Sequence, residues 1–207
     1  YGSTEAEPIA HISGREMLDW ISTDSDFSNQ EGVCVGHLSS LIQLALIPIQ
    51  KGPVELGEDP MMTHHLSDGH VGEVVVAGDH VCTAYYENHQ AFLDNKIREG
   101  ERIWHRTGDL GRIDAKKRLW LVGRVHNAIH RNGRLLFPVG PEQILKRCPG
   151  VKQAAYLGIP NPKLGEETWA VITLEPDHSV DLERLKKELF ETKEMEETAE
   201  IGVAAHW

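Results

Sequence analysis

Cysteine is scarce in this sequence, and long apolar runs are missing. Among 207 residues there are three cysteines, Cys34, Cys82 and Cys148, without C-x-x-C spacing. This pattern predicts free thiols in a reducing compartment, the cytoplasm, rather than a disulfide framework. The best apolar run, residues 38–49, is interrupted by polar residues and a proline. We therefore expect no transmembrane segment.

Positive charge is also scarce. The sequence has 21 Lys+Arg against 32 Asp+Glu, a formal net charge of −11. This balance argues against a nucleic-acid partner or an anionic membrane, since both need a basic face. A small anionic ligand is still compatible, because backbone amides and one or two positive groups can hold a phosphate. The chain opens on Tyr1, without an initiator Met or a signal peptide, so we expect a fragment or processed piece.

The apolar and turn residues predict an α+β protein in two parts, with a boundary near residues 123–126. The first part is expected to be β-rich, with a short helix and a long polar loop. The second is expected to be a small α+β domain, in which Asp181 caps the last helix and 191–200 form a solvated end. The expected strands are 44–49, 72–78, 118–123, 135–138, 151–159 and 169–174, the expected helices 88–97, 141–148 and 181–190, and the expected loop 55–69.

The first motif with chemical potential is Tyr1-Gly2-Ser3-Thr4-Glu5. Its ring can stack on a base, a hydroxyl can donate to a phosphate, and the carboxylate can hold Mg²⁺. Taken alone, the pentapeptide is more typical of a turn that leads into a strand.

Two further motifs lie downstream. Asp109 stands between Gly108 and Gly111, where it can accept both hydroxyls of a ribose or simply cap an Asp-Gly turn. Arg124 follows Gly123 and can pair with phosphate or ribose oxygens. The loop after it, which carries Gly133 and leads to Glu142, would let a backbone approach a ligand closely.

The order of these motifs resembles the adenylate-forming superfamily of acyl-CoA synthetases, peptide-synthetase adenylation domains and luciferases. The resemblance covers residues 1 to about 176. It is carried by Tyr1-Gly2-Ser3-Thr4-Glu5, by 72–78 with Tyr85-Tyr86, by Arg106-Thr107-Gly108-Asp109-Leu110 and by Gly123-Arg124. It implies that residues 1–123 are the β-rich, distorted barrel-like C-terminal part of a large AMP-binding domain. Residues 124–207 would be a truncated small C-terminal domain.

The resemblance also implies a nucleotide site and a reaction. Tyr1 and Gly2 would pack at the adenine, Thr4 would contact the α-phosphate, Glu5 would bind Mg²⁺, Asp109 would hold the ribose hydroxyls, and Arg124 would lie at the ribose beside an interdomain hinge. A carboxylic acid would attack ATP, release pyrophosphate and form an acyl-adenylate. The acyl group would then pass to CoA, a carrier protein or another acceptor, as in fatty acid metabolism.

Several positions depart from the superfamily pattern. His126 replaces the usual Asp at the hinge, and His130 replaces a Lys. With residues 82–86, Lys96-Ile97 and Trp104-His105, this region is most similar to the branch that contains the olefin-pathway β-lactone synthetases. The phosphate loop and the adenylation lysine of the superfamily are missing, so we expect truncation at both ends and no adenylation by the fragment alone. The alternative is a non-catalytic regulatory or partner-binding module that keeps the fold.

A few residues have two interpretations each. The loop histidines His64, His65 and His70 could bind a metal or be solvated, and solvation is favoured because no Cys or carboxylate cluster completes the set. Cys82 could be a nucleophile or a buried thiol. His105 could form an acid–base pair with Asp109 or be a packed structural imidazole. Trp120 and Trp169, in strand patterns, are expected in the core.

Overall fold

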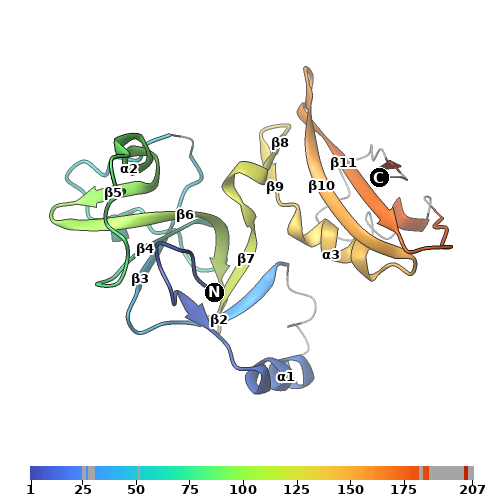
Figure 1. Cartoon of the computed structure of the whole chain (residues 1–207), viewed down its shortest axis with the longest axis horizontal. Helices are drawn as coiled ribbons and strands as arrows, with labels where there is room; N and C mark the ends of the chain where they lie inside the picture. Colours follow the sequence, from blue (N-terminus) through green and yellow to red (C-terminus); the bar gives the residue numbers. More distant parts are fainter. Residues whose placement is uncertain (25–26, 28–30, 51, 182–183, 187–202, 205–207) are drawn as a thin grey trace. The chain divides into compact units, whose positions relative to one another are not determined.

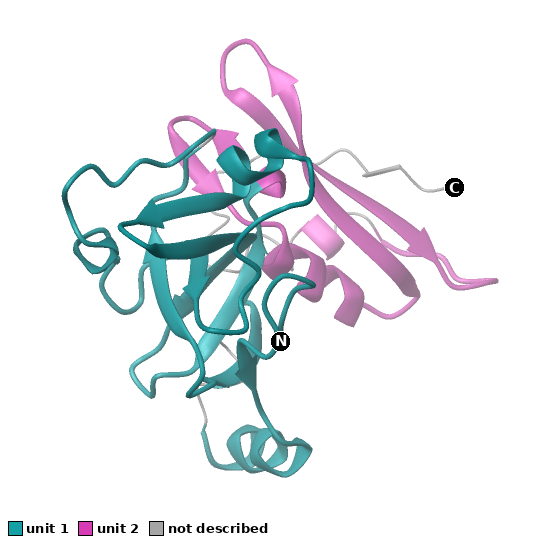
Figure 2. Cartoon of the chain, turned by 60° about the vertical axis from the view of Figure 1, so that its left-hand side comes forward, with its two compact units in different colours: residues 1–125 teal, residues 126–207 magenta. Residues whose placement is uncertain are grey.

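The computed structural model describes residues 1–24, 27, 31–50, 52–181, 184–186 and 203–204. The chain divides into two compact units, Tyr1–Val125 and His126–Trp207 (Figure 2). Among the described residues, no helix has both the length and the apolar character needed to span a bilayer.

The first unit is built on a curled, seven-stranded sheet (Figure 1). The strand order is β1-β2-β7-β6-β4-β3, and β5 pairs with β6 outside this path. The strands are β1 (Ala10–His11), β2 (Val33–Leu38), β3 (Gln43–Ile47), β4 (Gly72–Ala77), β5 (Lys96–Glu99), β6 (Arg102–Ile113) and β7 (Leu119–Arg124). The predicted α+β class with a distorted barrel-like part is thus confirmed.

Strand β4 is buried on both faces, which explains its continuous run of β-branched residues. Val74 and Val76 pack with Leu46 in one hydrophobic cluster. Val75, which points the opposite way, packs with Trp104 in another. The strand therefore joins two cores and gives the sheet a rigid centre.

The helices of this unit differ from the sequence prediction. Helix α1 (Gly14–Thr23) was not predicted, although Ser13 and Glu16 form a capping box at its start. Helix α2 (His89–Asn95), capped by Asn88, ends before Lys96, because Lys96 and Ile97 pair with β6 as part of β5. The predicted helix 88–97 was therefore too long. The long loop 55–69 contains one turn of 3₁₀ helix, η2 (Met61–Thr63).

The second unit contains a five-stranded sheet with the order β10-β11-β8-β9, and β12 pairs with β11. Helix α3 packs on β10, and its Glu142 accepts a hydrogen bond of 3.0 Å from the Tyr156 amide. The elements that follow β7 are η3 (Val125–Asn127), β8 (Ile129–Arg131), β9 (Arg134–Leu136), α3 (Val139–Arg147), β10 (Val151–Asn161), β11 (Gly165–Leu174) and β12 (Val203–Ala204).

The structure specifies the loop around Gly133 and corrects the expectation for Trp169. The loop around Gly133 is a hairpin turn between β8 and β9, since Asn132 and Gly133 both have positive φ, 50° and 74°. Trp169 is not in the core but 37% exposed, whereas Trp120 in the first unit is 2% exposed. The reason is register: Trp169 lies opposite Leu157, on the face away from the buried Tyr156 and its partner on β11.

Most of the predicted helix 181–190 lies outside the described residues, and 191–200 lie wholly outside them. Its start is described: the Arg184 amide donates to Asp181 Oδ1 at 3.3 Å, which confirms Asp181 as the cap. Leu185 is buried with the core of the second unit.

Candidate functional site

The candidate site is built around a bulge in β6. Val75 of β4 pairs with Arg106, and Glu73 pairs with Leu110. Val74 alone therefore faces three residues, Thr107 to Asp109, on β6. Gly108 takes φ of +71° in this bulge, a conformation that glycine adopts without steric penalty. The bulge turns Asp109 out of the regular alternation of the strand, so this segment is not the Asp-Gly turn considered above.

Asp109 is held from both sides. The hydroxyl of Tyr1 donates to Asp109 Oδ2 at 2.6 Å, and Nε of Arg124 lies 2.8 Å from Oδ1. Arg124 is opposite Asp109 in the register of β6 and β7. Burial and the hydrogen bond to Asp109 raise the pKa of Tyr1 well above its ordinary value. The phenol therefore stays protonated and keeps donating to the carboxylate.

The segment Tyr1 to Glu5 is both a turn and part of the site. The Ser3 amide donates to Ala6 O at 2.9 Å, and the Ala6 amide donates back to Ser3 O at 3.0 Å. This tight turn brings the segment against β6. A cavity of about 740 Å³ lies between them. All six residues predicted for the nucleotide site line it: Tyr1, Gly2, Thr4, Glu5, Asp109 and Arg124.

Glu5 is the carboxylate at the other end of the cavity. Its Oε1 accepts a hydrogen bond of 3.1 Å from Tyr85, and its Oε2 lies 3.8 Å from His105 Nε2. Burial raises the pKa of the Glu5 carboxyl, but hydrogen bonds from its own backbone amide and from Tyr85, with the charge of Lys96, outweigh burial and lower it. Glu5 is thus ionised at neutral pH.

Glu5 fits the role of a single protein ligand for Mg²⁺. The described residues hold no group of three or more His, Cys, Asp or Glu that could bind a metal. Mg²⁺ does not need such a group, because it commonly takes one or two carboxylates together with substrate phosphates and water. The ionised, cavity-lining carboxylate of Glu5 meets that requirement.

His105 is a packed structural imidazole, as one of its two interpretations predicted. It is 3% exposed, and its Nδ1 lies 3.3 Å from the carbonyl oxygen of Asn95. Burial and the charge of Lys96 lower its pKa to about 4. The carboxylate beside it is that of Glu5, so the acid–base pair with Asp109 is not formed.

Lys96 is a second buried basic residue at this end of the cavity, 3% exposed. Its ammonium donates to the carbonyl oxygen of Cys82 and lies 5.0 Å from the ring centre of Tyr85. Burial lowers the pKa of Lys96. Lys96 therefore supports the segment that presents Tyr85 to Glu5.

The remaining candidates have structural roles. His65 accepts a hydrogen bond of 2.9 Å from the Leu46 amide, and His70 bonds to Ser67, so these two histidines hold the loop. Nε2 of His64 is buried without a hydrogen-bond partner among the described residues. Cys82 is half-buried in a loop and donates to Ala84 O, which corrects the expectation of a buried core thiol. His126 and His130, in the second unit, are exposed.

Sequence reasoning gave no role to five residues that line the cavity: Glu7, Asn95, Arg106, Thr107 and Leu121. Arg106 and Thr107 belong to the motif that contains Asp109, so the sequence indicated that they lie near the site. The contacts of Arg106 and Thr107 could not be predicted from the sequence, because they depend on strand register.

The chain is similar in sequence to known enzymes. Residues 141–204 match the family model of the AMP-binding enzyme C-terminal domain. The olefin beta-lactone synthetase of Stenotrophomonas maltophilia is 32% identical over 164 residues, 77% of this chain and 29% of that protein. The 4-chlorobenzoate–CoA ligase of an Arthrobacter species is 35% identical over 177 residues, 84% of this chain and 31% of that protein. The chain thus spans less than a third of these relatives.

Solved structures show the same fold. The amide bond synthetase McbA of Marinactinospora thermotolerans superposes with a TM-score of 0.74 at 22% identity, over 99% of this chain and 36% of that one. The o-succinylbenzoate CoA synthetase MenE of Bacillus subtilis, in complex with its acyl-adenylate intermediate, superposes with a TM-score of 0.68 at 20% identity. The superposition covers 99% of this chain and 36% of that one. With the family model and the sequence relatives, this shared fold confirms the resemblance to the C-terminal portion of the adenylate-forming superfamily.

Proposed function

We propose that this chain, the C-terminal portion of an adenylate-forming enzyme, supplies one side of the nucleotide site of an ATP-dependent acid ligase. The observation that carries the proposal is the meeting of Tyr1, Asp109 and Arg124 at one carboxylate, with bonds of 2.6 and 2.8 Å. The two compact units would then be the end of the AMP-binding domain and the small C-terminal domain.

The geometry supports different roles for these residues at the adenine and at the ribose. The ring of Tyr1 would pack against adenine, with Gly2 next to it in the cavity lining. Asp109 would accept the ribose hydroxyls, since each carboxylate oxygen has a second lone pair beyond the one used by Tyr1 or Arg124. Arg124, whose side chain is 55% exposed, has further donors for ribose oxygens. The existing bonds fix the orientation of Asp109 before the nucleotide arrives.

Thr4 and Glu5 would act at the α-phosphate. The Thr4 hydroxyl would donate to a phosphate oxygen, and Glu5 would help to hold Mg²⁺. When bound, Mg²⁺ supplies neutralising charge for the phosphate oxygens. The oxygen of the acid substrate would attack the α-phosphorus, the bond to the bridging oxygen would break, and pyrophosphate would leave. Catalysis by this chain is then positioning and charge stabilisation, not acid–base chemistry.

The second step would pass the acyl group to an acceptor. The candidates are CoA, a carrier protein and an internal hydroxyl that closes a β-lactone. The relatives, which include CoA ligases and olefin beta-lactone synthetases, support the first and the third. His126 and His130 lie where the superfamily pattern has Asp and Lys, which opens this step to an acceptor other than CoA, or to none.

The test is carboxylate-dependent ATP–pyrophosphate exchange by the complete protein that carries this chain, against a panel of aromatic, fatty and 3-hydroxy acids. AMP affinity is measured in parallel. Exchange with at least one acid supports the ligase. AMP binding without exchange would favour the non-catalytic regulatory module, and absence of both would refute a nucleotide site.

A further inference from the structure

The bulge that presents Asp109 interrupts the ladder between β4 and β6. Between the pairs Val75–Arg106 and Glu73–Leu110, the backbone groups on either side lose their regular partners. Buried backbone N–H and C=O groups are rarely left unpaired, because the loss of a hydrogen bond there is not compensated by water. Something else must therefore satisfy them.

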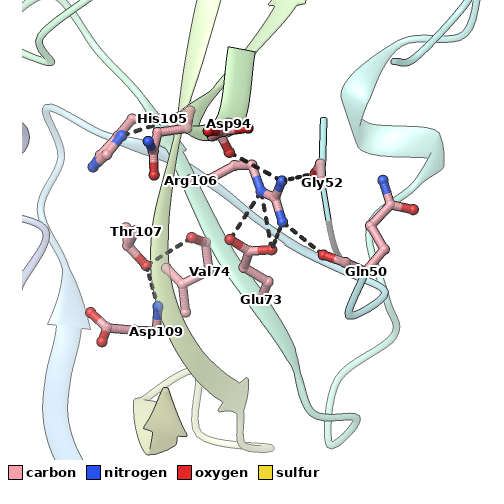
Figure 3. A network of polar contacts seen from close by, with 10 residues as sticks. Gln50, Gly52, Glu73, Val74, Asp94, His105, Arg106, Thr107 and Asp109 are labelled. Atoms are coloured by element: carbon pink, nitrogen blue, oxygen red, sulfur yellow. Dashed lines mark hydrogen bonds and ion pairs between the residues drawn. The ribbon is translucent and has the colours of Figure 1, made fainter. Parts of the chain in front are cut away.

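The Thr107 side chain takes that place (Figure 3). Its hydroxyl donates to the carbonyl oxygen of Val74 at 2.9 Å and accepts from the amide of Asp109 at 3.0 Å. Thr107 is 8% exposed. One hydroxyl thus closes the gap in the ladder and ties the Asp109 backbone to β4.

Arg106 and Glu73 hold β4 and β6 together beside the bulge, on the face of β6 opposite to Thr107. Arg106 donates from Nε and Nη2 to the buried carboxylate of Glu73, the shortest bond being 2.7 Å. The guanidinium also donates to three main-chain carbonyls, those of Gln50, Gly52 and Asp94. Neighbours on β4, Glu73 and Val74, are therefore bonded to neighbours on β6 (Figure 3).

We infer that Thr107 is a positioning residue for ribose recognition, with the Arg106–Glu73 pair as its support. This inference rests on the proposed nucleotide site and names the device that orients Asp109 in it. The Thr107 hydroxyl holds the Asp109 amide, and the Asp109 carboxylate then meets Tyr1 and Arg124 at fixed positions. Thr107 need not contact the nucleotide for its loss to weaken ribose recognition.

The test compares ribose discrimination in matched variants of the complete protein. AMP and 2′-deoxy-AMP affinities are measured by calorimetry, and we expect the wild type to prefer AMP by about 10-fold. Thr107→Val, which keeps the shape but removes the hydroxyl, should reduce the ratio to about 2-fold or less. Thr107→Ser, which keeps the hydroxyl, should retain it. A merely structural role would lower the amount of folded protein without changing the ratio.

Two more measurements separate the possible failures. In an Asp109→Asn background, Thr107→Val should not change the ratio of AMP to 2′-deoxy-AMP affinity any further. The reason is that Thr107 affects ribose recognition through the Asp109 carboxylate, which this background lacks. If Thr107→Val does not fold, amide hydrogen exchange of the wild type tests whether the Asp109 amide is hydrogen-bonded to Thr107. That amide should then be protected like the amides of β6 that pair with neighbouring strands. The inference is overturned if folded Thr107→Val has the same ratio of AMP to 2′-deoxy-AMP affinity as the wild type. It is also overturned if the backbone amide of Asp109 exchanges fast. Equal binding of both nucleotides by the wild type overturns the proposed ribose site instead, and exchange still decides the Thr107 bond.

Discussion

The hydroxyl of Tyr1 and the carboxylate of Asp109, 108 positions apart in the sequence, are joined by a hydrogen bond of 2.6 Å. The bond is short because the acceptor is charged. It links the turn at residues 1–5 to the bulge in β6, the two parts of the cavity that come from different motifs. Arg124 completes the contact from β7. The three motifs that are separate in the sequence thus converge on one side chain.

The first prediction concerns Asp109. Asp109→Ala removes the acceptor of the Tyr1 and Arg124 bonds and the proposed acceptor of the ribose hydroxyls. Each hydrogen bond to a charged group contributes about 1.5–3 kcal/mol, so AMP affinity should fall by about 100-fold. Carboxylate-dependent ATP–pyrophosphate exchange should be abolished.

Asp68→Ala is the matched control. Its carboxylate is 41% exposed and pairs with Lys117 at the surface, where ion pairs contribute little. This variant should bind AMP like the wild type. Unchanged exchange in Asp109→Ala would remove Asp109 from the site.

Sequence reasoning picked out residues that line one cavity because each motif is local. Tyr1, Thr4 and Glu5 lie within one pentapeptide, and Asp109 stands between glycines whatever the fold around it. The partners of these residues were out of reach. Thr107 and Val74 are connected only through the register of β4 and β6, and no local pattern reveals how many residues a bulge contains.

The errors in the fold have similar causes. Apolar Phe92, Leu93 and Ile97 suggested one helix, but Ile97 is fully buried by pairing in β5. Trp169 followed a strand pattern correctly, yet the side of the sheet that it faces is decided by pairing with β10. Tertiary pairing, and not residue type, settled each case.

The second prediction concerns acid stability. Asp114 is 9% exposed and accepts bonds from Arg118 Nε at 2.6 Å and from Trp120 Nε1 at 2.8 Å. Burial raises the pKa of Asp114, but these bonds and those from the backbone outweigh it and lower the pKa below its ordinary value. Since the unfolded chain then binds the proton more tightly, the stability due to Asp114 is present above about pH 4 and is lost as pH falls below it.

Asp114→Asn tests this relation. At pH 7 it should be less stable than the wild type by about 1–3 kcal/mol, and the difference should shrink between about pH 4 and pH 2. Urea unfolding at several pH values measures it. The exposed Asp59→Asn should follow the wild type throughout, and a pH-independent deficit in Asp114→Asn would contradict the prediction.

The third prediction concerns the buried pair of Arg106 and Glu73, which are 6% and 2% exposed. Glu73→Gln leaves the guanidinium without a counter-charge. Removal of one partner of a buried pair typically costs about 3–5 kcal/mol, and we expect a loss of that order in the free energy of unfolding. The exposed Glu58→Gln should change it by less than about 0.5 kcal/mol. A Glu73→Gln protein as stable as this control would mean that the pair does not hold β4 to β6.

The fourth prediction separates strain from function at two glycines. Gly108 and Gly133 have nearly the same φ, +71° and +74°, and a Cβ added at either would meet nothing within 4 Å. Alanine at each position should therefore destabilise the protein by a similar amount, about 1–2 kcal/mol.

The two alanine variants should differ in nucleotide binding. Gly108→Ala favours a different backbone conformation directly before Asp109, so AMP affinity should fall by about 10-fold or more, the equivalent of one hydrogen bond to a charged group. Gly133→Ala alters only the turn between β8 and β9, in the second unit, and should bind AMP like the wild type. Urea unfolding and calorimetry on both variants measure stability and affinity separately. Equal AMP affinity in the two variants would show that the conformation of the bulge does not control Asp109, whereas equal stability with unequal affinity would assign that control to Gly108.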